Sequence, residues 1–292
     1  MAQVRPPILA GSWYPGRRAD LTTLVDGFLQ AGPQPPPAGR PLVAVVPHAG
    51  YAYSGPTAGR LYARLRGKLP GRVVVLAPNH RRPLSAIALS GSGAFATPLG
   101  EVPVDTEATA RLAADAAFAV DDRAHADEHA VEIQLPFLQR LCPDDPPRIV
   151  PMLVPHLSEN QRASAARALA AVADSDTLLL VSTDFTHYGR AYSYVPFTDD
   201  IPDALERLDT GALLKILAGD GDGLRAYGRE TGITMCGLEA AALALDTGLP
   251  EGWEGALLDY SRSGDRDRDY SLSVSYAAVL LADGRTATGV AP

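Results

Sequence analysis

Three histidines in this sequence follow short apolar runs, and their side chains are of the kind that binds metals or transfers protons. The three junctions are 43-VAVVPHAGYAYSG-55, 73-VVVLAPNH-80 and 178-LLLVSTDFTHYG-189. They place His48, His80 and His187 within a few residues of an apolar run, and the third also supplies Asp184. Neutral imidazole is the commonest side-chain metal ligand, and an acceptor usually orients its second nitrogen. Asp184 is expected to be such an acceptor or an independent acid or base.

A thiol is the next candidate for chemistry. Cys236 lies in 231-TGITMCGLEAAALAL-245, where a segment rich in Gly and Thr leads into an apolar helix. The dipole at the N-terminus of a helix favours a thiolate, which suits a metal ligand or a nucleophile. The second cysteine, Cys142, precedes a proline at a predicted helix end. It is interpreted as a small hydrophobe that is buried or half-buried.

Acidic residues and histidines alternate at the start of 121-DDRAHADEHAVEIQLPFL-138. On a helix, His125, Glu128 and His129 would have the spacing i, i+3, i+4 and would share one face. The segment resembles the metal-binding helix of zinc proteases only superficially, because HADEH does not match HExxH. We expect instead the start of a helix at which Glu128 and His129 point toward the rim of a pocket.

Composition and missing motifs exclude several classes of function. The sequence lacks the G-x-S-x-G elbow of serine hydrolases. It also has no P-loop, and no G-x-G-x-x-G follows a strand, so nucleotide cofactors are not supported. The net charge of −8 and the sequence pI of about 5.2 argue against nucleic acid or an anionic membrane as a partner. The two cysteines show no paired spacing, and neither a signal segment nor a long apolar run is present. A cytoplasmic protein is expected.

The candidate residues must be positioned by alternating strands and helices. Apolar runs predict strands at 42–46, 73–77, 86–90, 148–154, 177–182, 255–260 and 272–281. Helical patterns occur at 19–30, 56–67, 105–117, 128–141, 159–173, 203–218 and 236–246. This alternation predicts an α/β fold, a three-layer α/β/α sandwich with a mostly parallel central sheet. Ligands bind beyond the carboxyl ends of the strands in such sheets, which is where His48, His80 and His187 fall.

The whole chain, 1–292, is predicted to form one domain. The Pro-rich segment 32-GPQPPPAGR-40 is too short to separate two domains and is interpreted as a stiff connector. Residues 1–10 and 283–292, at the two ends, are expected to be flexible.

The motifs, taken in order, resemble the Memo family. Seven of them carry the resemblance along nearly the whole chain: 11-GSWYPG-16, 47-PHAGYAYSG-55, 77-APNH-80, 127-DEHAVEIQLPFL-138, 182-STDFTHYG-189, 235-MCG-237 and 273-SVSYAA-278. Bacterial and archaeal members include the AmmeMemoRadiSam system protein B, named for its association with an AMMECR1-like protein and a radical-SAM protein. The resemblance implies a fold shared with class III (LigB-type) non-haem iron extradiol dioxygenases.

The resemblance also implies roles for individual residues. The metal ligands would be His48, His80 and Cys236, with His187 as the acid/base histidine and Asp184 beside it. Trp13 and Tyr53 match family positions around the pocket and, in the animal member, a surface that binds phosphotyrosine peptides. The predicted substrate or peptide pocket comprises Trp13, Tyr53, Asn79, Glu128 and His129.

The predicted ligand set differs from that of the dioxygenases. Their third ligand is a carboxylate, which suits Fe(II) and O₂. A thiolate at that position, from Cys236, implies Cu or thiolate-bound Fe(II), with Zn as an alternative, and makes ordinary catechol ring cleavage unexpected.

Three functions remain open on the sequence. The first is a metal-dependent oxidoreductase of unknown substrate. The second is a non-catalytic module that binds a peptide or protein and works with AMMECR1-like and radical-SAM partners. The third is a hydrolase with Cys236 as nucleophile and His187 as base.

Overall fold

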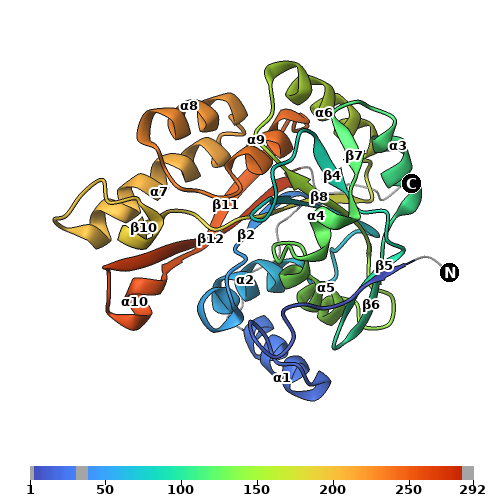
Figure 1. The fold of residues 1–292 in the computed structure, drawn as a ribbon, viewed down its shortest axis with the longest axis horizontal. Helices are drawn as coiled ribbons and strands as arrows, with labels where there is room; N and C mark the ends of the chain where they lie inside the picture. Colours follow the sequence, from blue (N-terminus) through green and yellow to red (C-terminus); the bar gives the residue numbers. More distant parts are fainter. Residues whose placement is uncertain (1–2, 31–38, 285–292) are drawn as a thin grey trace, which may run out of the picture.

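The computed structural model describes residues 3–30 and 39–284. Figure 1 shows a twisted sheet through the middle of the molecule with helices on both sides. The strands are β1 (Val4–Arg5), β2 (Pro41–Val46), β3 (Arg72–Pro78), β4 (Ile87–Leu89), β5 (Ala94–Thr97), β6 (Gly100–Pro103), β7 (Phe118–Val120), β8 (Arg148–Val154), β9 (Thr177–Ser182), β10 (His187–Gly189), β11 (Trp253–Arg262) and β12 (Leu272–Asp283). The helices are α1 (Arg18–Leu29), α2 (Tyr51–Leu65), α3 (Thr106–Ala113), α4 (Asp122–Ala126), α5 (Leu135–Leu141), α6 (Glu159–Val172), α7 (Ile201–Leu217), α8 (Gly221–Thr231), α9 (Leu238–Asp246) and α10 (Ser263–Asp267), with short 3-10 helices η1 (Glu132–Gln134) and η2 (Arg190–Tyr192).

The main sheet has the strand order β10-β12-β2-β9-β3-β8-β4-β7, and β11 pairs with β12 outside this path. Its four central strands, β2, β9, β3 and β8, are neighbours and run parallel. Antiparallel pairs flank this centre, with β12 against β2 on one side and β4 against β8 on the other. A separate three-stranded sheet, β1-β5-β6, lies beside β8, to which it connects by a bridge between Val104 and Ile149.

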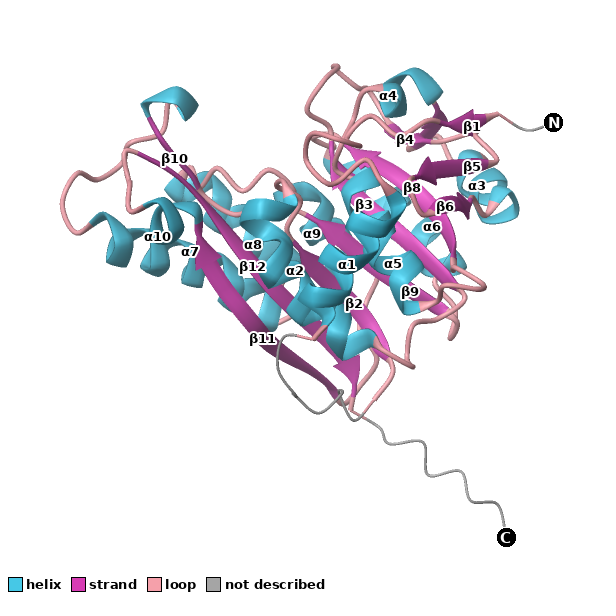
Figure 2. Cartoon of the chain, turned by 90° about the horizontal axis from the view of Figure 1, so that it is seen from below, coloured by secondary structure: helices cyan, strands magenta, loops and turns pink. Residues whose placement is uncertain are grey.

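Helices cover both faces of the main sheet, so its central strands are buried on two sides. Along β2, Val43 and Val45 belong to one hydrophobic core, and Ala44 and Val46 belong to the other. Figure 2 shows α1, α2 and α5 on one face and α6, α8 and α9 on the other. The consecutive apolar residues of these strands reflect this double burial. The predicted three-layer α/β/α sandwich is confirmed.

The predicted helix at 128–141 is wrong in its first half. Residues 127–131 are not helical, η1 follows, and α5 begins only at Leu135. The side chain of Glu128 accepts hydrogen bonds from the amides of His129 and Ala130, which holds the chain in a local turn. The strands β1, β5 and β6, which have four residues or fewer, and the amphipathic but mostly polar helix α8 were not predicted.

The N-terminal segment is packed rather than free. Arg5 in β1 is buried, and its guanidinium donates to the carbonyls of His125 and Glu128 and to the carboxylate of Glu132. Residues 3–10, expected to belong to a flexible end, are thus held by the core. The predicted Pro-rich connector lies mostly outside the described residues, as do residues 285–292 of the predicted C-terminal end.

The order of the central strands places the candidate residues together. His48 follows β2, His80 follows β3, and Asp184 and His187 follow β9. Since β9 lies between β2 and β3 and all three are parallel, their carboxyl ends meet at one edge of the sheet. Within 3–30 and 39–284, no helix combines the length and the apolarity that are needed to cross a membrane.

Candidate functional site

Three histidines converge at the carboxyl edge of the sheet. His48, His80 and His129 each offer a ring nitrogen, and these nitrogens all lie within 4.8 Å of one another. The rings of His80 and His129 stack with centroids 4.7 Å apart, and the ring of His48 lies edge-on to both. This geometry allows one small ion to contact all three residues.

Hydrogen bonds determine which nitrogen of His48 faces the cluster. The Ser182 hydroxyl donates to the carbonyl of Ala130 and receives a hydrogen bond from the amide of Gln134. Its oxygen, 3.2 Å from His48 Nδ1, is therefore an acceptor for the imidazole N–H. Nδ1 of His48 carries the proton, and the lone pair of Nε2 points toward Cys236. Burial, aided by the charge of His80, lowers the pKa of His48 to about 3, so the ring is neutral at neutral pH.

Glu128 orients His80 at two points. Its carboxylate accepts a 2.8 Å hydrogen bond from the backbone amide of His80 and lies 3.0 Å from His80 Nδ1. Because a carboxylate accepts here, Nδ1 of His80 carries the proton and Nε2 is free. Burial alone would raise the pKa of Glu128, but the hydrogen bond from His80 and the charges of His80 and His129 outweigh it and lower that pKa to about 2.

His129 contributes a nitrogen without a hydrogen-bond partner. Its Nδ1 lies 3.1 Å from Glu128 Oε1, but the contact lacks hydrogen-bond geometry and this buried nitrogen remains unsatisfied. Burial lowers the pKa of His129 to about 3, and the charge of His48 acts in the same direction. Trp13 packs on the ring at a centroid distance of 4.6 Å. The sequence placed His129 at a pocket rim, whereas the structure places its ring inside the histidine cluster.

Cys236 contacts the cluster through one histidine. Its Sγ lies 3.2 Å from His48 Nε2 and accepts a 3.3 Å hydrogen bond from the amide of Asp184. The residue precedes Gly237, the N-cap of α9, rather than lying inside the helix. Burial raises the pKa of the Cys236 thiol to about 12, and the charge of Asp184 acts in the same direction. The predicted stabilisation of the thiolate by the helix dipole is therefore outweighed by desolvation.

Asp184 and His187 flank the cluster without bonding to each other. Asp184 accepts a 2.8 Å hydrogen bond from the backbone amide of His48, and burial raises the pKa of its carboxyl. His187 Nδ1 lies 3.0 Å from the carbonyl of Phe185 and 3.1 Å from that of Thr234. These two carbonyls, and not Asp184, orient the ring. Because a carbonyl oxygen can only accept a hydrogen bond, Nδ1 of His187 carries the proton. Among the described residues, none forms a hydrogen bond with Nε2 of His187.

A cavity of about 540 Å³ opens onto the histidines. His48, His80, His129, Asp184 and His187 all line it, and so do Trp13 and Tyr53. The aromatic side chains are partly exposed, at 37% for Trp13 and 44% for Tyr53. The guanidinium of Arg266 lies 5.4 Å from the ring centre of Tyr53.

Two residues that the sequence suggested as candidates, Asn79 and His125, lie away from the histidine cluster. Asn79 lines a different cavity, and its amide donates to the carbonyl of Arg82, so it stabilises a turn. His125 turns away from the cluster and contacts the carbonyl of Ala88 at 3.0 Å. His125 and Glu128 do not share a helix face, because α4 ends at Ala126.

The donor set fits a transition metal. The imidazoles of His48 and His129 have pKa values of about 3 and are neutral, and a carboxylate holds the imidazole of His80. A thiol contacts His48. Fe, Cu and Zn prefer imidazole and thiolate ligands of this kind. The unsatisfied nitrogen of His129 is a second indication, since buried polar atoms without partners are rare in folded proteins. The histidine and cysteine side chains together could hold a metal ion.

These features define an α/β/α sandwich protein with a histidine-rich candidate metal site at the carboxyl edge of its central sheet. The family model described as "Memo-like protein" matches residues 5–280, and the chain belongs to this family. It is 37% identical over 290 residues to a MEMO1 family protein of Thermococcus onnurineus, covering 95% of this chain and 99% of the relative. It is 34% identical over 281 residues to a MEMO1 family protein of Aquifex aeolicus, covering 96% of this chain and 99% of the relative.

A solved structure supports the fold. The uncharacterized protein JW3007 from Escherichia coli K12 is similar with a TM-score of 0.53 and 16% sequence identity, covering 82% of this chain and 99% of that chain. At this identity the likeness concerns the arrangement of the elements alone.

Proposed function

We propose that the protein is a metal-dependent oxidoreductase that binds Fe(II) or Cu, with Zn as the alternative, through His48, His80 and Cys236. The observation that carries the proposal is the approach of three histidine nitrogens within 4.8 Å, with Cys236 Sγ 3.2 Å from one of these rings. His129 lies close enough to serve as a further ligand. Its unsatisfied nitrogen supports that role.

The residues around the ligands have separate tasks in this proposal. A bound Fe(II) or Cu would supply one-electron chemistry and polarise an oxygen of the substrate. His187 takes up or releases a proton at Nε2, because its Nδ1 is held by the carbonyls of Phe185 and Thr234. Asp184 fixes the backbone of His48 by accepting a hydrogen bond from its amide. Trp13 and Tyr53 line the same cavity with partly exposed side chains and contact a substrate that binds there.

Metal analysis of protein purified without chelator tests the proposal. The wild type is expected to contain a stoichiometric amount of Fe or Cu, and His48→Ala and Cys236→Ala are expected to lose it. Cys142→Ala and His156→Ala are matched controls, because these residues lie outside the cluster and are expected to leave the metal content unchanged. A wild type without stoichiometric metal, or undiminished metal in Cys236→Ala, would contradict it.

A second candidate is a non-catalytic module that binds a peptide or a protein. The exposed aromatic rings of Trp13 and Tyr53, which line the same cavity as the histidines, favour this function, because aromatic side chains are enriched at recognition sites. AMMECR1-like and radical-SAM proteins are the proposed partners. Co-purification that is lost in Trp13→Ala but kept in His187→Ala would support this candidate over catalysis. Loss in neither variant would count against it.

The hydrolase hypothesis receives less support. The imidazole that contacts the Cys236 thiol is His48 and not His187, and burial raises the pKa of that thiol to about 12. A nucleophilic cysteine requires the opposite shift.

A further inference from the structure

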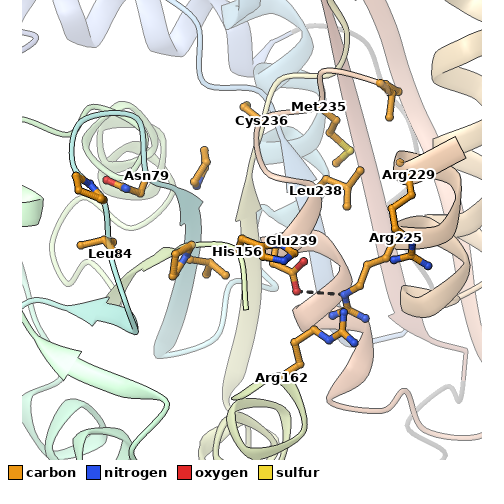
Figure 3. Close-up of a pocket in the computed structure, with 16 residues that line it drawn as sticks. Asn79, Leu84, His156, Arg162, Arg225, Arg229, Met235, Cys236, Leu238 and Glu239 are labelled. Carbon is orange, nitrogen blue, oxygen red and sulfur yellow. Dashed lines mark hydrogen bonds and ion pairs between the residues drawn. The ribbon is translucent and has the colours of Figure 1, made fainter. Parts of the chain in front are cut away.

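A second cavity reaches Cys236 from a side where none of the clustered histidines lies. It has a volume of about 600 Å³ and shares no lining residue with the cavity that contains His48 and Trp13. Its walls come from the segments after β3 and β8 and from α6, α8 and α9. Figure 3 shows Cys236 at one end, Asn79 and Leu84 along one wall, and Arg162, Arg225 and Arg229 along the other. This volume is in the range that holds a small organic ligand.

The three arginines of this cavity differ in their partners. Arg225 is 4% exposed, and its guanidinium pairs with Glu239, Asp246 and Asp222, so its charge is neutralised within the protein. Arg162 and Arg229 form no ion pair and donate no side-chain hydrogen bond among the residues that the structure describes. The surplus positive charge of the cavity therefore resides on Arg162 and Arg229, and the exposed side chain of His156 also lines the cavity.

The remainder of the cavity is largely apolar. Leu84, Val154, Ile233, Met235 and Leu238 line it between the arginines and Cys236. A guanidinium group presents a planar fork of donors that matches a phosphate or a carboxylate, whereas the aliphatic wall suits a hydrocarbon or aromatic body. The two regions together are complementary to a molecule with one anionic end and one apolar end.

We propose that this cavity is a second binding site, for a small organic anion whose phosphate or carboxylate contacts Arg162 and Arg229. The apolar body of the ligand lies against Met235 and Leu238 and extends toward Cys236. This site is distinct from the metal site proposed above, because the arginines that would bind the anion do not belong to the histidine cluster. A protein stripped of metal is expected to retain it.

The binding of 1-naphthyl phosphate to the metal-free protein, followed by calorimetry, tests this proposal. Replacing both Arg162 and Arg229 by Gln is expected to weaken binding at least about tenfold, since charge-assisted hydrogen bonds are lost. Arg167→Gln, an exposed arginine on the same helix α6, is the matched control and should not change the affinity. The uncharged 1-naphthol should bind at least about tenfold more weakly than the phosphate.

A second variant acts through shape rather than charge. Leu84→Trp adds bulk to the wall opposite the arginines and should weaken the binding of 1-naphthyl phosphate. Tyr53→Ala, in the other cavity, should not change this binding. Equal affinity in the double arginine variant and the wild type would overturn the proposal. So would binding that Tyr53→Ala abolishes while Leu84→Trp leaves it intact.

Discussion

The Cys236 thiol lies 3.2 Å from Nε2 of His48, although the two residues are 188 positions apart in the sequence. The contact depends on the residue that follows the cysteine. Gly237 donates a 2.8 Å hydrogen bond to the Thr183 hydroxyl, and a Cβ added to this glycine would approach the Thr183 side chain to 2.5 Å. Only glycine allows the start of α9 to lie this close to the end of β9.

Gly237→Ala is therefore expected to displace Cys236 from His48 and to weaken metal binding. We expect a loss of affinity of about tenfold or more, the size seen when residues that orient metal ligands are changed. Gly27→Ala in α1 is the control, because a Cβ there meets no atom within 4 Å. Competition with a chelator measures both affinities. Equal affinities in the two variants, with intact folds by circular dichroism, would refute this role of Gly237.

The strand-end histidines could be predicted from the sequence, whereas the position of His129 could not. His48 and His80 follow apolar runs, and the rule that parallel strands meet at their carboxyl ends brings them together. His129 depends on a non-helical turn that Glu128 stabilises by bonding to the amides of residues 129 and 130 and to His80. Arg5, 123 positions away, also holds this turn through the carbonyl of Glu128. Such long-range contacts leave no periodic signal in the sequence.

The environment of Cys236 likewise required the structure. The local sequence indicates a helix N-terminus, and the dipole there would lower the pKa of the thiol. The structure adds desolvation of the thiol and the nearby charge of Asp184, and both raise that pKa. The local sequence pattern predicts the helix, but the desolvation of Cys236 depends on which distant segments cover it.

The hydrogen-bond networks predict the same tautomer for three histidines. His48, His80 and His187 should each carry the proton on Nδ1, because Ser182, Glu128 and the carbonyl of Phe185 accept there. Nitrogen-15 NMR of the metal-free protein at neutral pH distinguishes the two ring nitrogens. A protonated Nε2 on a neutral ring of His48 would contradict this arrangement of hydrogen bonds.

Acid is expected to destabilise the metal-free protein. The pKa values of His48 and His129 are lowered from 6.5 to about 3, so the unfolded chain binds protons at these side chains that the folded protein does not bind. Stability is thus present above pH 6.5 and is lost as the pH falls from 6.5 toward 3. Each group contributes a slope of about 1.4 kcal/mol per pH unit.

Urea unfolding at several pH values in the presence of chelator measures this slope. His129→Asn should reduce the slope by the share of one group, and His156→Asn, at an exposed position, should not. Identical slopes in the wild type and His129→Asn would show that His129 is not held neutral by burial.

Glu132 anchors the loop that carries Trp13. Its fully buried carboxylate pairs with Arg5 and accepts hydrogen bonds from the amides of Ile8 and Leu9 and from the hydroxyl of Tyr14. Glu132→Gln leaves the charge of Arg5 buried without its partner, and we expect a loss of about 3–5 kcal/mol in the free energy of unfolding. Asp20→Asn, which breaks an exposed pair with Arg17, should cost less than about 1 kcal/mol. Urea denaturation compares the two, and equal losses would contradict the anchoring role.

The binding of a redox metal among the strand-end histidines is the proposal on which the function rests. Anomalous diffraction at the Fe and Cu absorption edges, from crystals of protein purified without chelator, tests it without recourse to an activity. We expect one strong peak within coordination distance of His48 Nε2, His80 and the Cys236 sulfur, and its absence from crystals of His48→Ala. A peak elsewhere in the molecule, or no peak at either edge in the wild type, would show that the histidine cluster does not hold such a metal.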